Sequence, residues 1–495
     1  MTANWLLKIF ILIICTIISG FLILYLGFSF FFILVIIFLL FFLFYFPREA
    51  FFLLIAYFPF QIALNPTPRI DLASIRIFII IFFLFWLFKS LSKKYIFIPK
   101  TIQSWSLLFF LFLVILSLLM AKNYEWALRK ILFLGSIFPL YFLISDSNYT
   151  GIYSKNPVKE KSKLVFVLIG SAVIMSLIGI FQFFAQFILG RECIFVFYKN
   201  FIAPIFFGKN FGKLVLNNPS WLVEISGKPL MRAISLFPDP HMLAFFIGMT
   251  LPFAFSFLFF SKKYKALLII AVICLTCALF LTFSRGGYFS IIISITVILF
   301  LGRKKISHNT KILFTFFSIV CLIFLFLWGS PIVYRFMSSF DLAEGSNLER
   351  LEIWNESFSI WTSSPWLGVG IGNYPLKINP SIDYRSPITS HNLYLDILSE
   401  TGIFALLIWL FLIFGTIFYL FKLISIFPKK TNNNKMKKEI KSEEFNLVLG
   451  LIGSLVYFSI HAFFETPIYN PQILTLFIII IGFSSFLKVT KQNAY

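Results

Sequence analysis

The side chain in this sequence best suited to move a proton is His391, within Ser390-His391-Asn392. An imidazole accepts a proton near neutral pH, so His391 is the candidate general base. Ser390 is a good N-cap residue, which predicts that His391 lies in the first turn of the helix that follows. The alternative is an interfacial histidine that only caps or packs.

Polar residues follow His391 at helical spacing. Asn392, Asp396 and Glu400 are four residues apart, so they share one face of a helix. An acidic residue within a membrane span costs about 2.5–3.5 kcal/mol on insertion scales. This face therefore predicts a cavity or polar partners rather than lipid.

Arginines stand beside other apolar segments. Arg285 lies in Ser284-Arg285-Gly286-Gly287, where the glycines allow a tight turn or a close approach to a ligand. A guanidinium there can bind two phosphate oxygens with its planar fork. The alternative is an arginine that extends its charged end to water from a helical hairpin.

Two further stretches hold candidate residues. Arg232 precedes Asp239 and His241 at the mouth of an apolar segment, where the last two bind a ligand or, as we prefer, cap the helix. Arg350 opens a stretch whose apolar positions predict an amphipathic helix along the membrane face, with Trp354, Phe358 and Trp361 toward it. The glycines that follow, at 368, 370 and 372, are interpreted as turn formers, because no strand precedes them and no GK[ST] follows.

The elements that must position these residues are membrane helices. Hydrophobic residues make up 60% of the 495 and charged residues only 13%, too few to cover a soluble protein of this length. Continuously apolar runs of about 20 residues span a bilayer as helices and exclude an alternating strand barrel. The predicted spans are 6–26, 28–46, 50–64, 74–91, 104–121, 126–145, 164–189, 241–260, 265–283, 286–301, 311–328, 393–421, 445–464 and 471–487.

The fold class is therefore an all-α polytopic membrane protein with about fourteen transmembrane helices. Five lysine-rich loops then fall on one side together with both termini, which the positive-inside rule assigns to the cytoplasm. The net charge of +22 comes largely from lysines in short loops, where they orient the helices. It does not predict nucleic-acid binding, because these lysines form no contiguous basic face. The segments are N-terminal helices at 1–189, an external loop at 190–240, helices at 241–328, a large external loop at 329–392 and C-terminal helices at 393–495.

These stretches, in this order, resemble the O-antigen ligase/polymerase superfamily over about residues 230–420. One pattern is similar to the ligase signature of the family: His391-Asn392, then nine residues, then Gly402-Ile403-Phe404-Ala405. Ala405 departs from that signature at its last position. Ser-Arg-Gly-Gly at 284–287 and the stretch from Arg350 through the glycine-rich turn resemble the other two marks of the family.

The resemblance implies a membrane glycosyltransferase of the GT-C type in the bacterial inner membrane. Its donor would be a glycan on undecaprenyl diphosphate at the outer face, and its acceptor a lipid A-core sugar (ligase) or a lipid-linked repeat unit (polymerase). His391 corresponds to the family's catalytic histidine. Arg285 corresponds best to its phosphate-binding arginines, with Arg350 and Arg232 as weaker matches. Asn392, Asp396, Glu400, Gly402 and Asp239 would support the site.

The sequence also leaves open a second class of function, transport. A transporter or flippase of lipid-linked oligosaccharide also has many spans and basic external residues. Such transporters usually show paired halves and helices broken at mid-membrane, and the sequence has no such internal symmetry. Glycan transfer is therefore the preferred interpretation.

The external loops contain no DxD or ExD pair and no cluster of histidines and carboxylates at metal-ligand spacing. Arginines must then neutralise a bound diphosphate, and we expect neither a metal nor another cofactor. Glycan transfer by the purified protein should therefore continue in a metal chelator. Loss of activity that added Mg²⁺ restores would contradict this expectation.

Overall fold

A computed structural model describes residues 41–67, 70–92, 94, 98–146, 157–225, 227–260, 264–303, 345–382, 388–426 and 435–485. Helices dominate, and two short antiparallel hairpins, β1–β2 and β3–β4, accompany them. In chain order the elements are α2 (Pro47–Tyr57), η1 (Phe58–Phe60), β1 (Ala63–Thr67), β2 (Ile70–Ala73), α3 (Ser74–Ser92), α4 (Ile102–Leu116), η2 (Ser117–Met120), α5 (Tyr124–Ile137), α6 (Pro139–Ser145), α7 (Pro157–Leu189), α8 (Arg191–Phe197), η3 (Tyr198–Ile202), α9 (Ala203–Phe206), α10 (Lys209–Leu216), η4 (Pro219–Trp221), β3 (Leu222–Ile225), β4 (Lys228–Met231), α11 (Pro240–Phe260), α12 (Lys265–Leu281), α13 (Arg285–Gly302), α15 (Gly345–Thr362), α16 (Tyr374–Ile378), α17 (Leu393–Ile426), α18 (Lys435–His461), η7 (Pro467–Tyr469) and α19 (Pro471–Ser485).

Within the described residues, eight helices are long and apolar enough to cross a bilayer, and two apolar helices, α12 and α19, are shorter. These ten agree with ten of the predicted spans. The predicted spans 6–26 and 311–328 lie outside the described residues, as does most of 28–46. The total of fourteen spans and the side of the termini remain predictions.

The predicted span at 50–64 is wrong as a single helix. Helix α2 has 11 residues and ends at Tyr57, so it rises only about 16 Å, roughly half of the apolar thickness of a bilayer. The short helical turn η1 carries Pro59, which has no amide hydrogen to donate, and the chain is extended at Gln61. It then enters β1, which pairs with β2 in the register Ala63 to Ala73.

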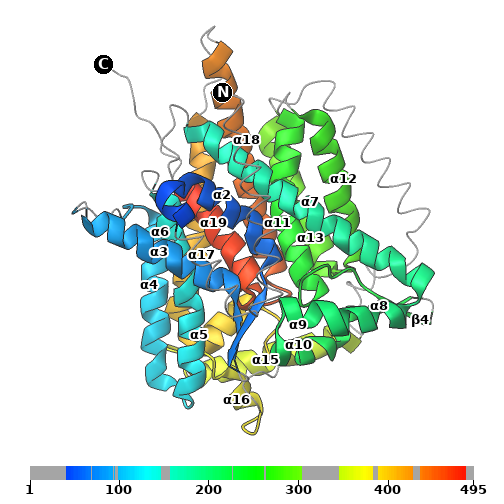
Figure 1. Cartoon of the computed structure of the whole chain (residues 1–495). Coiled ribbons are helices and arrows are strands. Elements are labelled where there is room, and N and C mark those ends of the chain that lie inside the picture. Colours follow the sequence, from blue (N-terminus) through cyan, green and yellow to red (C-terminus); the bar gives the residue numbers. More distant parts are fainter. Residues whose placement is uncertain are drawn as a thin grey trace.

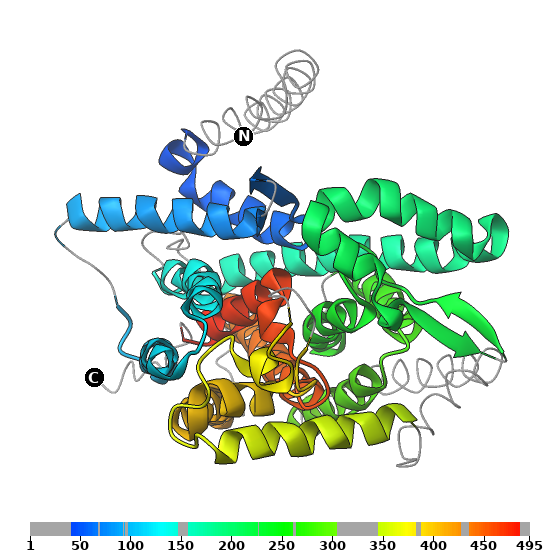
Figure 2. The same cartoon turned by 90° about the horizontal axis from the view of Figure 1, so that it is seen from below.

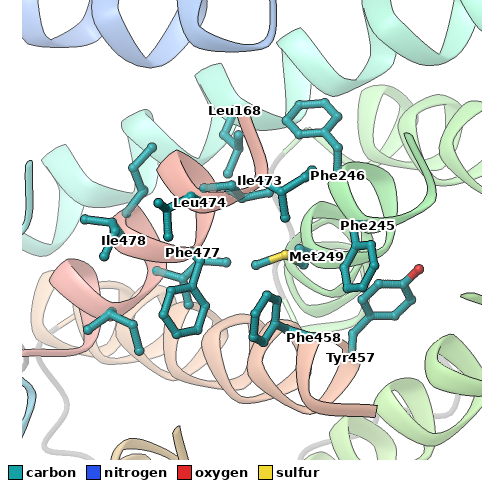
Figure 3. Packing of buried hydrophobic residues seen from close by; sticks show 14 of the residues in the cluster. Leu168, Phe245, Phe246, Met249, Tyr457, Phe458, Ile473, Leu474, Phe477 and Ile478 are labelled. Atoms are coloured by element: carbon teal, nitrogen blue, oxygen red, sulfur yellow. The ribbon is translucent and has the colours of Figure 1, made fainter. Parts of the chain in front are cut away.

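Helix α11 lies at the centre of the molecule, with nearly every residue buried. It packs closely on α18 because small residues face the contact: a Cβ on Gly248 would lie 1.9 Å from the Tyr457 ring, and one on Gly450 would lie 2.3 Å from Phe253. Figure 3 shows the core that results, formed by side chains of α7, α11, α18 and α19: Leu168, Phe245, Phe246, Met249, Tyr457, Phe458, Ile473, Leu474, Phe477 and Ile478.

The elements of the two predicted external loops gather at one end of the molecule. Figure 1 shows α8, α9, α10, α15 and α16 together there, opposite the start of α18. Figure 2, seen from that end, shows α15 along one side of the helix bundle. The β3–β4 hairpin projects outward from the bundle.

The glycine-rich turn docks against an interruption in α17. Gly402 has φ 81° and ψ 179°, so it breaks the helix, and Ile403 donates its amide hydrogen to the Pro365 carbonyl at 3.0 Å. Val369 donates to the Ser399 carbonyl at 2.8 Å, and Gly368 has a positive φ of 65°. The glycines therefore form turns, as predicted, and allow two backbones to meet.

Substitution of Gly402 by Ala should destabilise the protein. The added Cβ would lie 2.1 Å from the Trp366 carbonyl oxygen, and the backbone conformation alone costs a non-glycine residue about 1–3 kcal/mol. We expect a lower melting temperature in thermal unfolding of the detergent-solubilised protein. Gly415→Ala in the same helix is the matched control, because its Cβ would meet only ordinary contacts, the nearest at 3.4 Å. Equal melting temperatures for the two variants would contradict the docking role of Gly402.

Candidate functional site

His391 lies in the loop immediately before α17, not in the first turn of the helix as predicted. Its φ is 49°, a left-handed conformation in which histidine is among the enriched residue types. The N-cap is Asn392 rather than Ser390, because the Asn392 Oδ1 accepts from the amides of Tyr394 and Leu395. Ser390 instead donates its hydroxyl to the Asn392 carbonyl at 2.7 Å, which closes a tight local loop.

Contacts from two elements fix this loop. The Trp354 indole of α15 donates to the Ser390 carbonyl at 3.1 Å, and the Ser390 amide donates to Asp396 at 2.9 Å. The Leu393 amide donates to the carbonyl of Ala462, just after α18. The loop that presents His391 is thus held by α15, α17 and the end of α18.

Glu465 is the centre of the candidate site. His391 Nδ1 lies 3.0 Å from Glu465 Oε2, and an Arg350 Nη atom lies 2.9 Å from Glu465 Oε1. His241 Nε2 lies 3.6 Å from the same Oε1. The Glu465 side chain is about 10% exposed and that of His391 about 40%. The carboxylate is therefore enclosed, while the imidazole remains accessible.

A hydrogen-bonded series extends from this cluster into the bundle. Ser284 Oγ lies 3.1 Å from His241 Nδ1 and 3.2 Å from His461 Nε2. Ser284 also caps α13, since its Oγ accepts the Gly287 amide. A Cβ on Gly286 would lie 2.9 Å from the His461 ring, so this glycine allows α13 to approach α18 and is not at the tip of a turn. Three of the chain's four histidines therefore meet around Ser284 and Glu465.

The charges of the site set the ionisation of its members. Burial opposes ionisation of Glu465, but His241, His391 and Arg350 together outweigh it, so the pKa of this carboxyl lies well below its usual range. The hydrogen bond to Glu465, and then its charge, raise the pKa of His391 above the ordinary value. Burial, with a smaller contribution from Glu465, raises the pKa of Asp239 to about 6.

The three predicted phosphate-binding arginines have different surroundings. Arg350 joins the cluster through Glu465. Arg232 is buried and donates from Nε to the Thr282 carbonyl at 2.6 Å and from an Nη atom to the Ser220 carbonyl at 2.9 Å. Arg285 is partly exposed and directly follows Ser284, which places its backbone beside the cluster.

The predicted supporting residues are mainly structural. Asp396 accepts from Ser390 and from the Thr466 hydroxyl, and Glu400 accepts from Lys130 Nζ at 2.7 Å. All these partners are protein groups, as expected for an acidic face that avoids lipid. Asp239 accepts the Met242 amide at 2.9 Å and so caps α11, the alternative that we preferred.

The geometry supports acid–base chemistry at His391. When Nδ1 carries a hydrogen and donates it to Glu465, the second ring nitrogen has a lone pair that can accept a proton. Glu465 then stabilises the imidazolium that forms. Within the described ranges, no three His, Cys, Asp or Glu side chains are arranged to hold a metal ion.

Three residues of the site were not predicted from the sequence: Glu465, Ser284 and His461. A usable signal existed for Glu465: it is an acidic residue in the short segment between the predicted spans 445–464 and 471–487. In the predicted topology this segment lies on the same side of the membrane as the loop that contains His391. His461 lies at the end of an apolar run, where a packing role is the ordinary expectation.

Residues 270–410 match the model of a protein family described as O-Antigen ligase. The matched segment includes Ser284, Arg285, Arg350 and His391, whereas Glu465 lies beyond it. This match confirms the predicted resemblance to the O-antigen ligase/polymerase superfamily. No curated protein sequence matches the chain.

Replacement of Glu465 by Gln should lower the pKa of His391, because it removes the negative charge that raises it. The measurement is an NMR titration of histidine-labelled protein, in which only four histidines contribute. Glu192→Gln, at an exposed position on α8, is the control and should leave the His391 titration in place. An unchanged midpoint in Glu465→Gln would show that the pair does not form.

Proposed function

We propose that this chain, whose residues 270–410 match the family model described as O-Antigen ligase, transfers a glycan from undecaprenyl diphosphate to an acceptor at the outer face of the bacterial inner membrane. The observation that carries the proposal is the contact between His391 and the buried Glu465, with Arg350 on the same carboxylate. It provides an accessible base beside a partner that orients it.

The reaction joins an acceptor hydroxyl to the anomeric carbon of the donor sugar. As the new C–O bond forms, the bond from that carbon to the diphosphate oxygen breaks, and undecaprenyl diphosphate leaves with the bonding electrons. The hydroxyl proton passes to His391. Attack opposite to the leaving group inverts the anomeric centre. General-base assistance of this kind contributes about 10²–10⁴ in rate.

Glu465 acts as a positioning residue. By accepting the hydrogen on Nδ1, it favours the tautomer whose other ring nitrogen can take the proton. Its charge also stabilises the imidazolium once the proton has moved. In the free enzyme the same charge raises the pKa of His391, so the reactive neutral form is lost as the pH falls through that raised pKa.

Arg285 is the best candidate for the diphosphate. Arg285 follows Ser284 at the start of α13, where a helix N-terminus also favours negative charge. A diphosphate on Arg285 would place the donor sugar next to the histidine cluster.

The acceptor decides between the two activities of the superfamily. Purified protein would be given one defined lipid-linked glycan and, in turn, a lipid A-core acceptor or a second lipid-linked repeat unit. Transfer to the first defines a ligase, and chain extension on the second defines a polymerase.

His391→Ala should reduce transfer in cells by about 10²–10⁴-fold, because the base is lost. The glycan should then remain on undecaprenyl diphosphate at the outer face while the level of the protein is unchanged. His308→Ala, at a histidine of a predicted cytoplasmic loop, is the control and should retain transfer. Accumulation at the inner face would instead favour transport, and unchanged product would remove His391 from the mechanism.

A further inference from the structure

A cavity of about 370 Å³ opens beside the candidate active site. The β1–β2 hairpin, α5, the α9–α10 region and the segment after Glu465 form its walls. This volume lies within the range of about 300–1,000 Å³ found for small-ligand sites. A larger cavity of about 570 Å³, between α7 and α12, is mainly apolar and shares no lining residue with the cluster.

The cavity and the catalytic cluster share two segments of chain. Thr389 lines the cavity, and its Oγ1 accepts the His391 amide at 3.4 Å. The short connection from α18 to α19 supplies Glu465 to the cluster and then Tyr469, Asn470 and Gln472 to the cavity wall. A molecule in the cavity is therefore next to the loop that holds the base.

Three buried amide side chains at this wall retain unused hydrogen-bonding atoms. Gln61, Asn470 and Gln472 are 6%, 9% and 2% exposed. Gln61 Oε1 has no partner among the residues that the structure describes. Asn470 uses Oδ1 to cap α19, and Gln472 uses Nε2 to donate to the Pro59 carbonyl at 2.6 Å, which leaves one amide atom of each for another group.

The rest of the lining favours a ligand rich in hydroxyl groups rather than in charge. Lys130 is paired with Glu400 at 2.7 Å, and Asp71 accepts the amides of Asn210 and Phe211 at the start of α10. Arg76 is the third charged side chain of the lining, and its Nε donates to the Ser136 hydroxyl at 2.7 Å. All three charged side chains therefore already have protein partners. Aromatic rings line the remaining wall: Trp126, Phe133, Phe206, Phe207, Phe211 and Tyr469.

Amides next to aromatic faces match the two kinds of surface on a sugar ring. Hydroxyl groups exchange hydrogen bonds with amides, while the ring's C–H groups, weakly positive, pack on the negative face of an aromatic ring. We propose that this cavity is a saccharide subsite that holds a sugar of the donor or the acceptor beside His391. The assignment deepens the proposed function and rests on it for the identity of the sugar.

The test compares two buried glutamines. Gln61→Leu removes an amide at the cavity with little change in volume. Gln103→Leu is the matched control, since Gln103 is 2% exposed, also has an unpartnered amide atom among the described residues, and lies in α4 away from the cavity. The probe is repeat-unit oligosaccharide released from the producing cell's own surface polysaccharide. Its binding to the full-length protein is measured by saturation-transfer NMR and equilibrium dialysis.

We expect Gln61→Leu to weaken binding about three- to tenfold, as for loss of one neutral hydrogen bond, and Gln103→Leu to bind as the unaltered protein does. In the transfer assay, Gln61→Leu should raise the KM of only one substrate. That substrate, donor or acceptor, is the one whose sugar occupies the cavity. Equal binding by both variants, or no binding by the unaltered protein, would overturn the subsite. If transfer is absent in every variant while Gln61→Leu alone binds weakly, the proposed function fails and the subsite stands.

Discussion

An ionised carboxylate loses its hydration when it is buried, and a fold tolerates it only where cations and hydrogen-bond donors replace the water. Glu465 meets this condition with Arg350 of α15 and His391 of the loop before α17, and the His241 ring of α11 lies 3.6 Å from the same carboxylate. Because each partner comes from a different element, the elements must come together for the charge to be buried. The geometry of the site is thus a requirement of folding as well as of chemistry.

The signature residues around His391 act mainly as its scaffold. Trp354 holds the Ser390 carbonyl, and Gly402 and Gly368 let α17 and the glycine-rich turn meet backbone to backbone. The nine residues between Asn392 and Gly402 form a helical segment about 13.5 Å long. That length spans from the loop at His391 to the docking point at Pro365, so a different spacing would move one end out of register. Ala405 is fully buried in the same region, which suits the small residue found there.

The sequence predicted the parts of the structure that depend on residues close together in the chain. Ten spans followed from the length of apolar runs, while the run at 50–64 failed because Pro59 and Gln61 end the helix before it can cross a bilayer. His391 was identified by its type and spacing, and Arg350 by the resemblance to the family. Their meeting at Glu465 was not, because α15 and the segment after α18 are separated by about a hundred residues and are joined only by tertiary packing. The cap prediction for Ser390 is wrong for a similar reason: Asn392 caps α17, and the Ser390 carbonyl accepts from Trp354 of the distant helix α15.

Because the proposed donor is anionic, an anion at the centre of the site requires an electrostatic explanation. Arg350 offsets Glu465 before the reaction, so the pair presents little net charge to an approaching diphosphate. In the proposed mechanism His391 takes the acceptor's proton, and the cluster would then gain a positive charge at the moment when negative charge collects on the departing diphosphate. Groups that are already oriented toward developing charge need no reorganisation as the reaction proceeds. Under the proposed mechanism, Glu465 would therefore help catalysis by stabilising the protonated histidine, and Arg350 would keep the charge of Glu465 from repelling the donor.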